Sequence, residues 1–168
     1  MWVSKRVMVM GLVAVVAVLS MALSVGAFGS RGHNSAELIK ASLAPSVPTD
    51  PAFHGVSPGG APWVLDRGEV RIKADGKFEL RVRGLVIPAP PGDGTPGGVN
   101  TISASLYCGA DSNTVPADTT QQVPISRKGD ARIRDRSFDV PDECLAPVVL
   151  VHPNGNTTRY IAVDGWRR

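Results

Sequence analysis

The sequence is poor in the residues that metal sites, redox centres and aromatic binding surfaces require. Its 168 residues include two cysteines, three histidines and nine aromatic residues. The cysteines lie 36 positions apart without a CxxC motif, and His33, His54 and His152 are not at metal-ligand spacing from one another. A zinc site needs about four such ligands, so we predict no bound metal and no cofactor.

The first 27 residues have the layout of a secretory signal peptide. Lys5 and Arg6 give a positive start, residues 7–25 carry no charge, and small residues precede a cleavage site after Ala27. An uncleaved membrane anchor over residues 7–27 is the alternative, because about 20 apolar residues span a bilayer. Both interpretations place the rest of the chain outside the cytoplasm, either secreted or anchored.

The charge balance does not favour nucleic acid as a partner. Lys5 and Arg6 leave with the signal peptide, so 16 of the 18 basic residues remain against 15 acidic ones. A net charge close to neutral, with acids interleaved among the bases, gives little attraction for a polyanion. We therefore predict no nucleic-acid partner, and a membrane partner only if the N-terminal segment stays uncleaved.

Cys108 and Cys144 are predicted to form a disulfide, because an even cysteine count in an exported chain favours one. The bond would close a loop of about 37 residues, worth on the order of 3.5–4 kcal/mol in the chain-entropy model. A metal site or a reactive thiol is the alternative use of the two side chains.

Residues 28–54 are predicted to be a flexible spacer with one possible short helix. Asn34 and Glu37 resemble a capping box before "SAELIKASLA", and Pro45 would end that helix. Prolines then recur every three residues, which is typical of an extended linker. The folded domain is expected to cover residues 55–168.

The stretch "EVRIKADGKFELRVR" (69–83) predicts a β-hairpin, because apolar and charged residues alternate on both sides of a turn. A two-residue Asp75-Gly76 loop would pair apolar with charged side chains. A three-residue loop, Ala74-Asp75-Gly76, pairs Ile72 with Phe78 and makes both faces consistent, with Gly76 left-handed. Arg71 then faces Glu79, and the charges form the solvated face of a sheet.

Short strands follow at intervals of about ten residues, with no convincing helix after residue 55. Residues 101–108 place alternate side chains inward and leave Ser103, Ser105 and Tyr107 outward. Pro124 indicates an edge strand, and the apolar run at 146–153 a central one. We predict an all-β, Ig-like β-sandwich of seven or eight antiparallel strands. Surface loops are expected at 88–98 and 109–119.

The segments "GGAPWVLDRGEVRI", "VRGLVIP", "ASLYC", "GDARI" and "YIAVDGW" resemble small secreted β-sandwich proteins of unknown function from high-GC Gram-positive bacteria. The similarity covers most of residues 55–168. Its motifs are turns, strands and a cysteine, so it implies a fold and an export route but no catalytic residue.

Three weak patterns for site chemistry are present. "GVSPG" (55–59) matches the nucleophile-elbow motif as text, but Pro58 lacks the N–H that an oxyanion hole needs. Asp111, Asn113 and Asp118 offer oxygen ligands for calcium, although without the spacing of a known loop. A Ser–His–Asp triad can assemble from distant positions, yet no residue pattern indicates one. We expect His152 to be a partly exposed residue at a strand end.

The resulting functional hypothesis is an exported, non-catalytic module with a binding or structural role at the cell envelope or outside. Its partner would be an envelope or extracellular protein or a glycan. Glycan binding requires an exposed aromatic residue. Tyr107 and Tyr160 are expected to point outward, whereas Trp63, Phe78, Phe138 and Trp166 are expected in the core or at its rim. The alternative is a small secreted hydrolase or a protease inhibitor that presents the proline-rich 88–98 loop.

Expression of the full chain in a high-GC Gram-positive host tests the export and disulfide predictions together. We expect a soluble protein in the culture fluid that begins near Phe28 and has no thiol that can be alkylated without reduction. Intact mass measurement reports both features. Full-length protein in the membrane fraction would contradict cleavage, and two alkylated thiols would contradict the disulfide.

Overall fold

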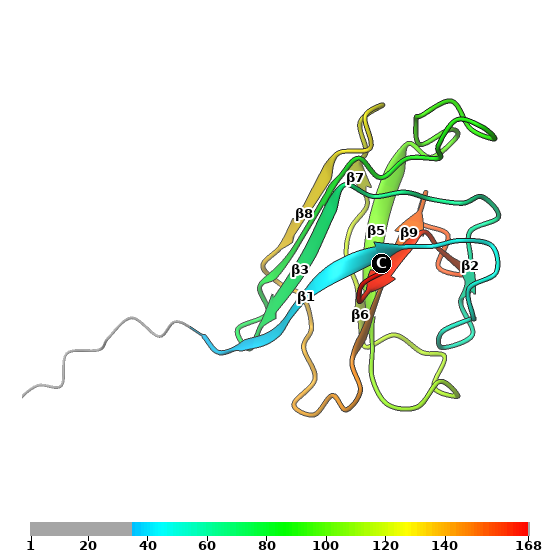
Figure 1. Cartoon of the computed structure of the whole chain (residues 1–168). Helices are drawn as coiled ribbons and strands as arrows, with labels where there is room; N and C mark the ends of the chain where they lie inside the picture. The colour runs from blue at the N-terminus through cyan, green and yellow to red at the C-terminus, as the bar shows by residue number, and fades with distance from the viewer. Residues whose placement is uncertain (1–34, 168) are drawn as a thin grey trace, which may run out of the picture. The chain divides into compact units, whose positions relative to one another are not determined.

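The computed structural model describes residues 35–167 (Figure 1), and this part of the chain contains strands and no helix. The predicted signal peptide or anchor and His33 lie outside the described residues. No helix in residues 35–167 is long and apolar enough to span a membrane.

The strands are β1 (Glu37–Pro45), β2 (Ser57–Pro58), β3 (Arg67–Lys73), β4 (Phe78–Arg83), β5 (Thr101–Tyr107), β6 (Asp118–Thr119), β7 (Val123–Pro124), β8 (Ala131–Asp135), β9 (Val148–Pro153), β10 (Arg159–Tyr160) and β11 (Ala162–Asp164).

Most strands belong to one antiparallel sheet in the order β6-β5-β9-β11-β1-β3-β4-β8, with β7 also pairing with β5. The sheet curls, so that β3, β4 and β8 face β5 and β9 across the main hydrophobic core (Figure 1). A short parallel pair, β2 with β10, lies apart from this sheet. The all-β antiparallel prediction is confirmed, and so are the edge position of Pro124 in β7 and the central position of β9.

The spacer and helix predictions are wrong for residues 37–45, which form β1. The first part of β1 pairs with β3, where Ala41 lies opposite Val70, and its last part pairs with β11, where Leu43 lies opposite Asp164. Local capping signals favoured a helix, but pairing on two sides outweighs local propensity. The folded unit therefore begins near Ser35, twenty residues before the predicted boundary.

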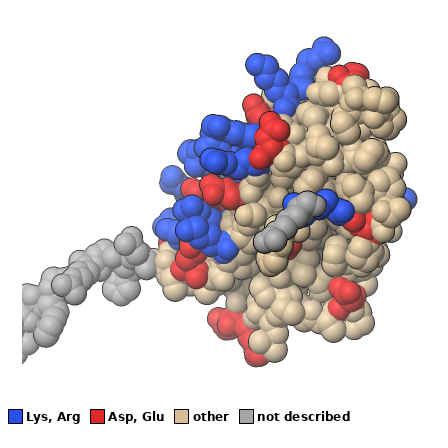
Figure 2. Space-filling model, in the orientation of Figure 1, with Lys and Arg blue, Asp and Glu red and all other residues tan. Residues whose placement is uncertain are grey.

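The hairpin has the predicted three-residue loop. Ile72 lies opposite Phe78, Arg71 lies opposite Glu79, and Gly76 is left-handed with φ 77°. The ion pairs differ from the expected cross-strand pairs, because Glu69 contacts Arg71 at 3.7 Å and Glu79 contacts Arg132 of β8 at 3.8 Å. Figure 2 shows basic and acidic side chains gathered on the side of the molecule that β3 and β8 occupy.

The prediction that one face of β5 is exposed is wrong. Ser103, Ser105 and Tyr107 are all buried, since the segment between β1 and β2 and the residues of β10 cover that face. Val56 and Tyr160 form a second apolar cluster with Tyr107 there. The sheet thus has a core inside its curl and a smaller core outside it.

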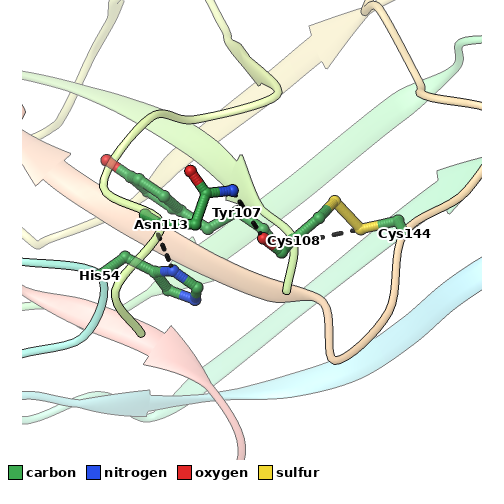
Figure 3. The surroundings of a disulfide bond; sticks show 5 residues. All are labelled: His54, Tyr107, Cys108, Asn113 and Cys144. Atoms are coloured by element: carbon green, nitrogen blue, oxygen red, sulfur yellow. Dashed lines mark hydrogen bonds between the residues drawn. A yellow bond between two sulfur atoms is a disulfide. The ribbon is translucent and has the colours of Figure 1, made fainter. Parts of the chain in front are cut away.

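The predicted disulfide between Cys108 and Cys144 is confirmed, with a Cα–Cα distance of 5.0 Å. It joins the end of β5 to the loop that precedes β9 (Figure 3). Of the predicted loops, 88–98 contains no strand and has a single bridge from Thr95 to Ile87, whereas the last two residues of 109–119 form β6. A single bridge joins Val64 and Val86.

Replacing Ala41 with proline tests whether β1 is part of the fold. Proline removes a strand N–H and leaves its former partner unsatisfied, so we expect a loss of about 2–4 kcal/mol in the free energy of unfolding. The control Ala41→Val keeps the N–H and should stay close to wild type. Denaturant unfolding measures the stability of both variants. An unchanged midpoint for Ala41→Pro would indicate that these residues are a spacer and not part of the fold.

Candidate ligand-binding site

A hollow of about 470 Å³ lies where the chain after β11 passes the turn between β1 and β2. Its wall combines apolar side chains, including Phe53, Val148 and Val163, with the charged residues Asp50 and Asp164. Hollows of about 300–1,000 Å³ with apolar walls and a few polar groups are typical of small-molecule sites. We call this hollow the Trp166 cavity, after the tryptophan that also lines it.

Asp50 fixes the geometry of the cavity. Its Oδ2 accepts a hydrogen bond from the N–H of Val47 at 2.8 Å, which closes the turn. Both of its carboxylate oxygens also accept from Nη2 of Arg167, at 2.5 and 2.6 Å. Asp50 therefore fastens the chain after β11 to the turn, and this contact holds Trp166 beside the cavity.

Tyr160 supports the same turn from beneath. Its hydroxyl donates to the carbonyl oxygen of Pro51 at 2.7 Å, and its ring packs on Phe53 with centroids 5.6 Å apart. Burial and the nearby Asp50 carboxylate raise the pKa of Tyr160 to about 12, so its hydroxyl stays a neutral donor. The predicted outward position of Tyr160 is wrong, because its side chain is fully buried.

Trp166 is the exposed aromatic residue of this site, with 81% of its surface accessible. Trp63, Phe78, Tyr107 and Phe138, by contrast, are at most 4% exposed. Tyr107 and Tyr160, which were expected to point outward, are buried, and Trp166, which was expected in the core or at its rim, is on the surface instead. The sequence alone could not show this, because it depends on which segments cover β5.

Asp164 places a second carboxylate in the cavity wall. Its Oδ1 accepts from the N–H of Val149 at 2.8 Å, and burial raises the pKa of its carboxyl. With Asp50 it gives the cavity two acceptor groups beside an aromatic ring. This combination suits a ligand with several hydroxyl groups and an apolar face.

A buried Ser–His contact lies elsewhere, between β5 and β9. Nε2 of His152 is 2.9 Å from Oγ of Ser105, and Nδ1 is 2.7 Å from the carbonyl oxygen of Arg159. A carbonyl oxygen thus occupies the place of the triad carboxylate, and neither side chain is accessible to a substrate. The expectation of a partly exposed His152 is wrong. The contact instead joins two strands, and burial lowers the pKa of His152.

His54 is also buried rather than free before the domain. Its ring stacks on Tyr107 with centroids 4.9 Å apart, and its Nδ1 is 2.8 Å from the carbonyl oxygen of Asn113 (Figure 3). Its backbone N–H donates to Asp111 at 3.3 Å. His54 therefore ties the loop after β5 to the turn that precedes β2.

The structure gives the three calcium candidates separate partners. Asp111 accepts from His54, the amide of Asn113 donates to the carbonyl oxygen of Cys108, and Asp118 accepts from the N–H of Asp139. Across residues 35–167, no group of three or more His, Cys, Asp or Glu side chains is arranged to hold a metal ion.

The residues of "GVSPG" do not form a nucleophile elbow. Ser57 lies in β2, which pairs in parallel with β10, and the N–H of Gly59 donates to the carbonyl oxygen of Tyr160 at 2.8 Å. The elbow needs a strand followed by a helix, and no helix follows here.

Comparison with known proteins gives no match to a protein-family model, a curated protein or a solved structure. The similarity to small secreted proteins of high-GC Gram-positive bacteria therefore stays a prediction.

The buried His152 predicts a loss of stability on mild acidification. Its folded pKa lies below the ordinary 6.5, so below that pH the unfolded chain takes up the proton first. We expect the free energy of unfolding to be insensitive to His152 above pH 6.5 and to fall as the pH is lowered below 6.5. Urea titrations across this range should show a shallower slope for His152→Gln, and an unchanged slope would contradict this origin.

Proposed function

We propose that this protein is an exported, non-catalytic binding module of Ig-like β-sandwich architecture that holds a saccharide in the Trp166 cavity, at the cell envelope or outside the cell. The facing halves of the curled sheet support the sandwich description. The signal-like N-terminus and the disulfide support export.

The exposure of Trp166 beside a cavity is the observation that carries the proposal. An indole that is 81% exposed has a flat face available for contact, and this face matches the C–H face of a sugar ring. The carboxylates of Asp50 and Asp164 line the same cavity and can accept hydrogen bonds from sugar hydroxyls. The site is pre-organised, because the Asp50–Arg167 contact already holds the tail in place.

Hydrolysis is the second candidate function, because glycoside hydrolysis uses two carboxylates and one of them has a raised pKa. Asp164 has this raised pKa, and Asp50 lines the same cavity. However, Asp50 is bound by Arg167 and Asp164 by a backbone N–H. Both acids are thus already engaged in structural contacts, which favours binding over catalysis.

Substitution of Trp166 by alanine should abolish most saccharide binding. We expect the mature protein to be retained by at least one member of a panel of chitin, cellulose and purified bacterial cell wall. Trp166→Ala should bind about tenfold or more weakly, because a buried aromatic contact is worth on the order of 1.5–3 kcal/mol. Depletion assays with increasing amounts of polysaccharide give the affinities.

The matched control is Val115→Ala, which removes another exposed apolar side chain, 70% accessible, in the loop after β5. It should bind like wild type. Equal retention of Trp166→Ala and wild type, or no retention of wild type on any member of the panel, would contradict the proposal. Release of reducing sugar that is lost in Asp164→Asn would instead support the hydrolase.

A further inference from the structure

The outward face of β1, β3, β4 and β8 is strongly basic, although the chain as a whole is nearly neutral. Eight basic and three acidic side chains lie there. The rest of the described chain contains six basic and twelve acidic residues. The eleven residues of this face are Glu37, Lys40, Arg67, Glu69, Arg71, Lys73, Glu79, Arg81, Arg83, Arg132 and Arg134.

The register places like charges directly opposite one another. Arg67 lies opposite Arg83 between β3 and β4, and Arg81 lies opposite Arg132 between β4 and β8. Directly opposed like charges destabilise a sheet, by roughly 0.2–1 kcal/mol for a cross-strand pair. The register also places Glu69 opposite Arg81, and Arg132 contacts Glu79, so these two arginines have acidic neighbours. Arg67 and Arg83 face each other with no acid opposite either, which indicates that something other than folding stability selects them.

The three acids on the face do not neutralise this group. Glu37 lies opposite Lys73, at the other end of β3 from Arg67. Glu69 pairs with Arg71 and Glu79 with Arg132, while Arg67, Arg81 and Arg83 form no ion pair with any described residue. These three arginines line a hollow of about 250 Å³ together with Ser42, Gly68 and Glu69. Three guanidinium groups around one hollow can bind phosphate oxygens in pairs, which a flat surface of lysines cannot do.

We propose that this hollow binds the phosphate groups of a linear, phosphate-bearing polymer. Arg132 and Arg134 continue the array from the hollow toward the edge strand β8. Neighbouring strands are about 4.8 Å apart and alternate residues about 7 Å apart, so the five arginines form a diagonal row that a flexible chain can follow. A single phosphate would engage only the hollow.

Protection of a sheet edge does not account for the whole array. Charged residues on an edge strand prevent edge-to-edge aggregation, and this explains Arg132 and Arg134 of β8. Arg67 and Arg83 pair with each other at the ends of β3 and β4, outside the pairing with β8. Their direct opposition around a hollow therefore needs a separate explanation, and an anionic ligand provides one.

Long-chain inorganic polyphosphate is the probe for the test, with the mature protein titrated between about 50 and 200 mM salt. The double variant Arg67→Gln/Arg83→Gln should bind about tenfold or more weakly, and the slope of log K against log salt should fall by about two. The control Arg127→Gln/Lys128→Gln removes two exposed charges from the turn before β8, outside this face, and should change affinity less than threefold. Denaturant unfolding should show the first variant to be at least as stable as wild type.

Three results would overturn the proposal. They are no binding of polyphosphate by wild type, an equal loss of affinity in both double variants, and unchanged binding with increased aggregation in Arg67→Gln/Arg83→Gln. Binding to vesicles that contain phosphatidylglycerol, without binding to polyphosphate, would assign the face to a membrane instead. Because Trp166→Ala leaves this face intact, failure here and failure of saccharide binding are separate outcomes.

Discussion

The fold depends on a single strand that belongs to both halves of the curled sheet. The first residues of β1 pair with β3, and its last residues pair with β11. Without β1, the group of β3, β4 and β8 would lose its hydrogen-bonded connection to β5, β9 and β11. Leu43, at the crossing point, is buried in the core between them. The curl, and hence the core inside it, follows from this shared strand.

The outer layer gives the molecule its candidate site. The segment from Ser46 to Gly59 crosses the outside of β5 and β9, buries His54 and Tyr107, and presents Asp50 to the end of the chain. The Trp166 cavity is therefore formed by residues more than one hundred positions apart. The basic face lies on the other half of the sheet, so the two proposed binding surfaces are supported by different strands.

Sequence patterns predicted the parts of the fold that local rules determine. Alternation and turn chemistry fixed the register of the hairpin, and cysteine count and context predicted the disulfide. The strand at 37–45 depends on pairing with distant strands, and the burial of Tyr107 and His152 depends on distant segments that pack over them. No local sequence pattern predicts either. Neither Trp166, which was expected in the core or at its rim, nor Asp50 was a candidate from the sequence. The basic face was hidden for a similar reason, because it appears only when the register brings β8 beside β4.

The pairing of β1 with β11 also determines when this protein can fold. Residue 43 lies opposite residue 164, so the contact that closes the sheet joins nearly the two ends of the described chain. A chain that appears from its N-terminus onward, during synthesis or translocation, exposes β1 with only one of its two partners until the last strand emerges. Contacts of such high sequence separation slow folding and leave strand edges unpaired for longer. The sheet can therefore be completed only after β11 has emerged.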